Sequence, residues 1–279
     1  MNVMRSLLKC ESAFFRYRDV PILKGVTIAV AEGAFLGVIG PNGVGKSTLI
    51  RVLTGTLLPE RGNVLLENKP LTAFTRRAIA RKLAVVSQTD ASDFGFTVWE
   101  EVMLGRSPHH GGIHYENRED RAIVEMALEK TQIAHLATRR LDTLSGGERQ
   151  RVRIARGIAQ QPAIVFLDEP TTHLDLYSQL ALMELLKDIN EHGIAVFLVS
   201  HDINFVAQCC ADVHLMHDGA ILAHGTPREV ITPELVATCF RIRADVSVDP
   251  ATSIPRINPL GILRPEEGSA ASLNRDAVV

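Results

Sequence analysis

The sequence contains few cysteines and few aromatic residues. Its four cysteines, among 279 residues, include no CxxC pair, and Cys209 is adjacent to Cys210. This spacing excludes a disulfide framework and predicts reduced, structural thiols. Aromatic residues make up only 5% of the chain, whereas hydrophobic residues make up 46% and charged residues 22%. These proportions are typical of a globular protein with an apolar core and exclude a disordered or collagen-like chain.

Long apolar runs and an excess of charge are also absent. No segment approaches the roughly 18 apolar residues of a membrane-spanning helix. The first 15 residues include no sustained apolar segment with a small-residue cleavage site, so we expect no secretory signal and a cytoplasmic location. With 30 Lys and Arg against 32 Asp and Glu, the formal net charge is -2. Such a charge gives no general attraction to nucleic acid, and we expect no nucleic-acid partner.

Apolar periodicity predicts an α/β protein. Alternating residues at 8–15 and 22–30 predict two antiparallel strands at the start of the chain. Further along, a short buried strand precedes a helix three times: 35–39 with 47–53, 164–167 with 179–189, and 195–200 with 205–210. This alternation predicts a parallel sheet that is covered by helices.

The remaining patterns predict the domain organisation. Residues 89–160 are mostly helical in pattern, and we interpret them as a subdomain inserted into one domain over residues 1–245. Residues 244–248 alternate before a proline-rich stretch, which predicts a hairpin at the start of a C-terminal part over 246–279. The last residues are small and polar, so a disordered tail is expected.

A phosphate-binding loop is the clearest motif in the sequence. The octapeptide GPNGVGKS lies between a predicted strand and a predicted helix, where its glycines let backbone N–H groups turn toward a phosphate. Lys46 is expected to reach the β- and γ-phosphates, and the Ser47 hydroxyl suits Mg²⁺. The predicted nucleotide contacts are Gly40, Pro41, Asn42, Gly43, Val44, Gly45, Lys46, Ser47 and Thr48.

Two adjacent carboxylates follow a second buried strand. Asp168 ends the apolar run 164–168 and is expected to reach Mg²⁺, directly or through water. Glu169 points the other way from the strand end and is placed to polarise water for attack on the γ-phosphate. Such a pair on its own more often caps a helix or a turn. The phosphate-binding loop makes the catalytic interpretation the better one.

A third motif, LSGGERQ at 144–150, separates the sequence from other proteins with a phosphate-binding loop. Ser145, Gly146 and Gly147 precede a predicted helix, so a hydroxyl, bare backbone N–H groups and a helix N-terminus form a second anion site. With this motif, residues 8–245 resemble the ATP-binding subunits of ABC transporters. The resemblance implies a P-loop NTPase core of the RecA type, ATP and Mg²⁺ as cofactors, and ATP hydrolysis. It also implies a head-to-tail dimer in which the motif of one copy closes over the ATP of the other.

The resemblance assigns further residues in the expected order. Tyr17 resembles the aromatic residue that stacks on adenine, and Gln88 resembles the catalytic lid glutamine that contacts Mg²⁺. THLD at 172–175 resembles the loop that crosses the dimer, which places Asp175 near the shared ATP. His201 resembles the catalytic switch histidine that reads the γ-phosphate.

Three segments, at 97–109, 169–175 and 225–236, resemble the importer branch that serves ferric siderophores, haem and cobalamin. The implied partners are polytopic membrane permease subunits and, indirectly, a solute-binding protein, with this chain peripheral on the cytoplasmic face of the membrane. Ferric siderophore or haem is the first choice of solute. Cobalamin, another metal or an oxyanion remains an alternative, as does an ABC ATPase without a membrane partner. His214 and His217 are expected to be exposed on one face of a strand.

Overall fold

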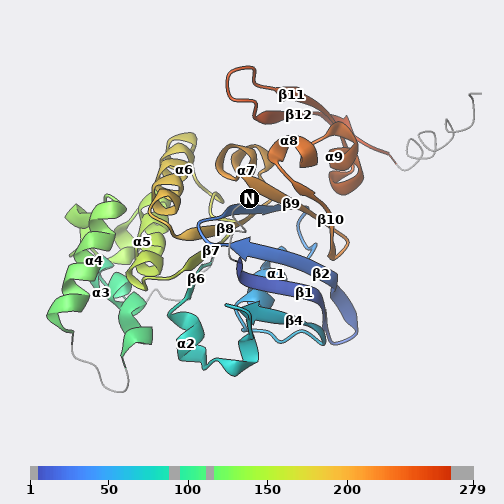
Figure 1. The fold of residues 1–279 in the computed structure, drawn as a ribbon. Coiled ribbons are helices and arrows are strands. Elements are labelled where there is room, and N and C mark those ends of the chain that lie inside the picture. The colour runs from blue at the N-terminus through green and yellow to red at the C-terminus, as the bar shows by residue number, and fades with distance from the viewer. Residues whose placement is uncertain (1–5, 88–94, 111–115, 265–279) are drawn as a thin grey trace, which may run out of the picture.

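The computed structural model describes residues 6–87, 95–110 and 116–264 (Figure 1). Its centre is a sheet of six strands: β3 (Phe35–Ile39), β6 (Leu83–Val86), β7 (Ile164–Asp168), β8 (Ala195–Ser200), β9 (Asp212–His217) and β10 (Ala220–Gly225). Their order in space is β10-β9-β3-β8-β7-β6. Only β10 runs antiparallel to its neighbour, so β3, β7 and β8 end at the same edge of the sheet.

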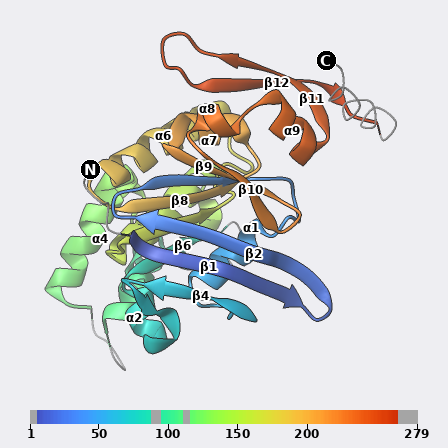
Figure 2. The ribbon, with the colours of Figure 1, turned by 45° about the vertical axis from the view of Figure 1, so that its right-hand side comes forward.

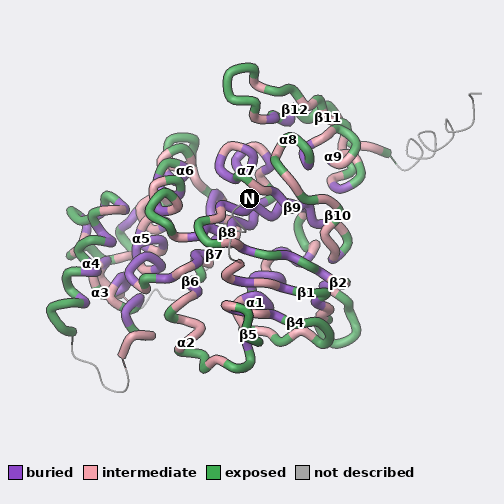
Figure 3. The backbone as a smooth tube through the Cα atoms, viewed as in Figure 1, coloured by how far each residue is buried: buried purple, intermediate pink, exposed green. Residues whose placement is uncertain are grey.

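A second sheet lies against one face of the first (Figure 2). It is antiparallel, in the order β2-β1-β4-β5, and comprises β1 (Ser6–Tyr17), β2 (Val20–Ala31), β4 (Arg61–Leu66) and β5 (Lys69–Pro70). One apolar core fills the space between the two sheets. It includes Leu8 and Val26 from the second sheet, Leu49 from the first helix, and Phe166 with Phe197 from the central sheet. Buried residues gather in this middle of the molecule (Figure 3).

Helices pack on both faces of the central sheet, and those from α3 to α5 form the helical region on the left of Figure 1. The helices are α1 (Lys46–Leu53), α2 (Arg76–Ala80), α3 (Val98–Met103), α4 (Arg118–Lys130), α5 (Gly146–Ala159), α6 (Leu176–Glu191), α7 (Ile203–Cys209), α8 (Pro227–Val230) and α9 (Pro233–Phe240). Short 3₁₀ turns lie at η1 (Leu71–Ala73), η2 (Leu104–His109), η3 (Ala134–Leu136) and η4 (Leu141–Thr143). None of the helices among the described residues has the length and apolar character needed to cross a membrane.

Each helix of the helical region is capped at its N-terminus by a polar side chain. Thr97, Asn117 and Ser145 each accept a hydrogen bond from a backbone N–H in the first turn of α3, α4 and α5. The backbone N–H of each cap residue in turn donates to an acidic side chain three residues later. These reciprocal bonds satisfy N–H groups that a helix start leaves free. The sequence therefore specifies where α5, the helix after the LSGGERQ serine, begins.

The C-terminal strands β11 (Ile242–Val248) and β12 (Pro255–Ile262) form an antiparallel hairpin beside α7, α8 and α9 (Figures 1 and 2). The expected α/β class, the antiparallel β part and the helical region are all confirmed. The predicted disordered tail beyond residue 264 and Gln88 lie outside the described residues.

The expected exposure of His214 is wrong. His214 is only 6% exposed, because its strand β9 lies between β3 and β10 and is also contacted by α8 and α9. The His214 ring stacks on that of His224 in β10, with 5.3 Å between ring centroids. Burial lowers the pKa of His214 to about 4, so the imidazole stays neutral at neutral pH.

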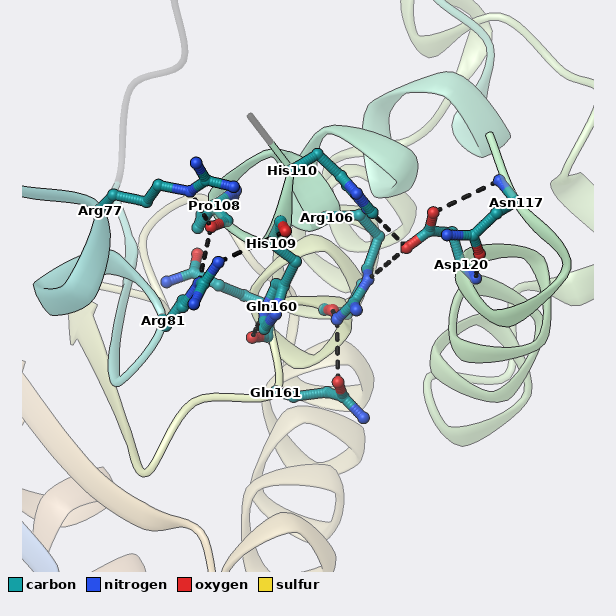
Figure 4. A network of polar contacts seen from close by, with 11 residues as sticks. Arg77, Arg81, Arg106, Pro108, His109, His110, Asn117, Asp120, Gln160 and Gln161 are labelled. Carbon is teal, nitrogen blue, oxygen red and sulfur yellow. Dashed lines mark hydrogen bonds and ion pairs between the residues drawn. The ribbon is translucent and has the colours of Figure 1, made fainter. Parts of the chain in front are cut away.

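A polar network joins the helical region to the central sheet (Figure 4). Arg77 of α2 and Arg81, which directly follows this helix, both donate from Nε to the Pro108 carbonyl in η2, at 2.8 and 2.9 Å. Gln160, at the end of α5, donates from Nε2 to the Leu83 carbonyl at the start of β6, at 2.8 Å. These bonds attach η2 to α2 and the end of α5 to β6.

The centre of this network is a buried ion pair. Arg106 Nε lies 3.0 Å from Asp120 Oδ1, and the two side chains are 5% and 1% exposed. Arg106 Nη1 also donates to the Ala159 carbonyl and to Gln161 Oε1, at 2.8 and 2.9 Å. His110 Nε2 lies 2.9 Å from the same oxygen of Asp120. Because both charges are paired and hydrogen-bonded, their burial is tolerated.

We predict that Asp120→Ala lowers the free energy of unfolding by about 3–5 kcal/mol, because it leaves the Arg106 charge buried without its carboxylate. The matched control is Glu60→Ala, which breaks the exposed ion pair with Arg16 and should cost about 1 kcal/mol or less. Urea unfolding measures both. Equal losses for the two variants would contradict the importance of burial at Asp120.

Candidate functional site

The loop between β3 and α1 has the conformation that its glycines permit. Gly43 and Gly45 have φ angles of 80° and 110°, which disfavour any residue with a Cβ. A Cβ at Gly40 would lie 2.5 Å from the Met216 carbonyl oxygen of β9, so only glycine fits there. The loop is therefore held against β9 while α1 begins at Lys46 with its N-terminus facing the loop. This arrangement provides backbone N–H groups and a helix dipole for an anion.

Lys46 supplies a buried cation at this loop. Its side chain is 5% exposed, and Nζ lies 2.8 Å from the Gly40 carbonyl and 3.1 Å from that of Pro41. Nζ also lies 3.2 Å from Glu169 Oε1, which provides the compensating negative charge. The ammonium group of a lysine in this position can bind a phosphate oxygen in place of the carboxylate.

Ser47 and Asp168 meet beside the loop. Ser47 Oγ donates to Asp168 Oδ1 at 3.0 Å, joining the start of α1 to the end of β7. Burial raises the pKa of the Asp168 carboxyl, while the hydrogen bond from Ser47 opposes that rise. A hydroxyl and a carboxylate are the oxygen ligands that Mg²⁺ prefers. The pair therefore fits a divalent cation, whose charge would also favour the ionised carboxylate.

Glu169 contacts both Lys46 and the end of the neighbouring strand β8. Its Oε2 lies 2.6 Å from His201 Nδ1, and it accepts hydrogen bonds from the His201 backbone N–H at 3.1 Å and from Ser200 Oγ at 3.4 Å. The Glu169 φ angle is 51°, a left-handed conformation that is unfavourable for a residue with a side chain. With this backbone conformation, Glu169 Oε1 lies 3.2 Å from Lys46 Nζ.

Lys46, Glu169 and His201 help to line a pocket of about 410 Å³. The structure thus brings together most of the predicted residues of the phosphate-binding loop with Glu169 and His201. The residues that line the pocket are Ile22, Asn42, Gly43, Gly45, Lys46, Ser47, Thr48, Glu169, Thr172 and His201. Its volume and its mixture of N–H groups, one cation and one carboxylate suit the phosphate groups of a nucleotide.

The other predicted contacts lie outside this pocket. Tyr17 is 40% exposed, packs edge-on against Phe15 and accepts a hydrogen bond from Arg51. Asp175 caps α6 by accepting from the Ser178 N–H at 2.7 Å, and Ser145 caps α5. None of the predicted signature residues Ser145, Gly146 and Gly147 lines the pocket of the same chain.

Two residues of the site, Thr172 and Ser200, have no individual role in the sequence analysis. Thr172 lines the pocket, and its buried Oγ1 has no hydrogen-bond partner within the described part of the chain. Ser200 donates to Glu169 and accepts from the Asp202 N–H, at 3.4 and 3.0 Å. Their positions next to assigned motifs were the only sequence signal, because a lone hydroxyl residue carries no pattern.

Comparison with known proteins identifies the family. The family model described as "ABC transporter" matches residues 23–172. The ferric enterobactin transport ATP-binding protein FepC of Escherichia coli is 36% identical, over 94% of this chain and 97% of that protein. The hemin import ATP-binding protein HmuV of Gloeobacter violaceus is 39% identical, over 94% and 98%.

Solved structures agree with this result. The structure of cbiO1 from Clostridium perfringens, part of the ABC transporter complex cbiONQ, is 32% identical, with a TM-score of 0.73 over 84% of this chain and 94% of that chain. The matched residues include the phosphate-binding loop and the two carboxylates at the end of β7. The chain belongs to the ABC transporter family and is one of its ATP-binding proteins, an ATPase.

Proposed function

We propose that the pocket around Lys46 binds the phosphates of ATP and that Glu169 activates the attacking water. The observation that carries this proposal is the convergence of Lys46, Glu169 and His201 at one edge of the sheet. Incoming phosphates compete with Glu169 for Lys46, which frees Oε1 of the carboxylate to accept a proton from water. The water oxygen then bonds to the γ-phosphorus as the bond to the bridging oxygen of ADP breaks.

His201 is proposed to hold the other carboxylate oxygen of Glu169 and to contact the γ-phosphate. Mg²⁺ held by Ser47 and Asp168 would neutralise charge on the phosphates and on the departing oxygen. Gln88, outside the described residues, is proposed as a further contact to this ion, and Tyr17 as the adenine contact. Thr172 is proposed as an additional hydroxyl donor to the phosphates, because its Oγ1 is buried at the pocket.

Two copies are proposed to share their sites head to tail. Ser145, Gly146 and Gly147 form the N-terminal end of α5, which offers N–H groups to an anion. They do not line the pocket of their own chain, so a second copy is the natural source of this contact. Asp175 caps α6, and the first turn of this helix lies beside the LSGGERQ motif. A Cβ at Gly147 would lie 2.8 Å from Ser178 Oγ in that turn. We propose that this joint surface closes over the partner's ATP.

We further propose that hydrolysis powers a membrane importer for a ferric siderophore or haem. The relatives that act on ferric enterobactin and hemin support this choice. The partners would be polytopic permease subunits and, through them, a solute-binding protein, with this chain peripheral at the cytoplasmic membrane face. Cobalamin import is a second candidate, because a cobalamin import ATP-binding protein of Halobacterium salinarum is 37% identical over 90% of this chain and 62% of that protein.

Residues 1–245 are proposed as the ATPase domain, with 89–160 inserted and 246–279 as a C-terminal part.

We predict that Glu169→Gln retains ATP affinity but lowers turnover by about 10²-fold or more, because the amide keeps the shape and cannot accept the proton. Lys46→Ala should instead lose ATP binding, because the phosphate-directed cation is missing before and during the reaction. Steady-state hydrolysis and fluorescent-nucleotide binding measure the two defects. Wild-type hydrolysis by Glu169→Gln would exclude Glu169 as the general base.

A mixed-dimer experiment tests the shared site. Lys46→Ala and Ser145→Arg should each abolish hydrolysis alone, whereas a dimer of the two contains one site with both residues intact. Two affinity tags isolate the mixed dimers. The matched control pairs wild type with a chain that carries both substitutions, and this dimer has no intact site. Equal activity in the two mixed dimers would contradict the head-to-tail arrangement.

The importer proposal predicts contact between the helical region and a permease. Leu104→Cys, in η2, should crosslink to a permease subunit that is co-expressed with this chain. Leu222→Cys in β10 is the control, because both leucines are 44% exposed.

Deletion of this chain should abolish growth on a ferric siderophore or haem as the sole iron source. Unchanged uptake of both, with loss of cobalamin uptake, would instead support the second candidate.

A further inference from the structure

Helix α7 contacts three parts of the molecule: the turn that holds Glu169, strand β3 and the C-terminal hairpin. It begins two residues after His201, and its cap Asp202 accepts from the Phe205 N–H at 3.0 Å. The preceding turn is the one that holds Glu169, through Ser200 Oγ and the His201 N–H. Any rotation or shift of the first turn of α7 therefore moves two of the groups that orient the Glu169 carboxylate.

The inner face of α7 packs closely on the strand that leads into the phosphate-binding loop. A Cβ at Gly37 in β3 would lie 2.4 Å from Val206 Cγ1 and 2.8 Å from Cys210 Sγ. Glycine at this position lets the helix approach the strand without a spacer. Because protein interiors are packed without slack, α7 and β3 transmit displacement to one another.

The outer face of α7 is attached to the C-terminal hairpin by one side chain. Asn204 Nδ2 donates to the Ile257 carbonyl at 3.2 Å, and the Ile257 N–H donates to Asn204 Oδ1 at 2.8 Å. The amide thereby satisfies both backbone groups of one residue on the outer edge of β12, as a neighbouring strand would. Ile257 itself is buried in the core that includes Ile203, Phe205 and Val206 of α7.

We propose that Asn204 is a positioning residue for ATP hydrolysis, through which the hairpin β11–β12 holds α7 and hence the Glu169–His201 contact in place. The hairpin is then a structural brace for the catalytic edge of the sheet and not only a C-terminal appendage. This inference rests on the proposed role of Glu169. It assigns Asn204 no contact with ATP, because Asn204 faces the hairpin and does not line the phosphate pocket.

Three variants of the full chain test the brace. Asn204→Ala removes both hydrogen bonds to Ile257, and Asn204→Asp retains the acceptor for the Ile257 N–H but loses the donor to its carbonyl. Gln208→Ala is the matched control, because this amide lies one turn later on the same helix. Among the residues that the structure describes, its one hydrogen bond goes to the Asn204 carbonyl, within α7. Thermal unfolding of each variant sets an assay temperature at which all are folded.

We expect Asn204→Ala to lower kcat by about ten-fold while the ATP dissociation constant stays within about two-fold, because positioning is lost and phosphate binding is kept. Asn204→Asp should fall between Asn204→Ala and wild type, and Gln208→Ala should stay within about two-fold of wild type in both quantities. Hydrogen exchange of the backbone amides at 200–206 should be faster in Asn204→Ala than in Gln208→Ala.

The inference is overturned if Asn204→Ala keeps wild-type kcat and wild-type exchange, or if ATP binding and kcat fall together as in general unfolding. Failure of the proposed function has a different signature. The role of Glu169 would be rejected if the wild-type chain hydrolyses no ATP. It would also be rejected if Glu169→Gln hydrolyses ATP at the wild-type rate while Asn204→Ala still shows a lowered kcat. The exchange at 200–206 then still decides whether the hairpin holds α7.

Discussion

The ion pair between Lys46 and Glu169 depends on the parallel arrangement of three strands. β3, β8 and β7 are neighbours in the central sheet, and the residues that follow them carry the cation, the histidine and the carboxylates. Parallel neighbours end at a common edge, so groups that lie far apart in the sequence meet there. The left-handed backbone at Glu169 completes the contact. In the proposed function, the phosphates of ATP replace this internal counter-charge beside Lys46.

The two layers around this edge have different roles. The antiparallel sheet and the core beneath it support the phosphate-binding loop from one side. On the other side, α7 packs against β3 at Gly37 and continues the turn that holds Glu169. The amide of Asn204 extends this support to the C-terminal hairpin. A motif of eight residues is therefore held by elements drawn from both ends of the described chain.

The helical region is organised around α5. Its N-terminus presents the LSGGERQ serine and glycines away from the pocket of the same chain, and its C-terminus is fixed to η2 through Arg106 and to β6 through Gln160. The buried Arg106–Asp120 pair joins η2 to α4, and Arg106 also bonds to the Ala159 carbonyl at the end of α5.

The sequence by itself determined the α/β class, the phosphate-binding loop and the carboxylate pair, because each is encoded by contiguous residues with a local preference. Glycines in the loop, apolar runs before a charge and capping residues before a helix need no distant partner. Only the tertiary structure decided that His214 is buried, that Ser200 and Thr172 belong to the site, and that Asn204 meets Ile257. Each of these depends on a neighbouring strand or helix from elsewhere in the chain. A single polar residue shows no periodicity from which that neighbour could be inferred.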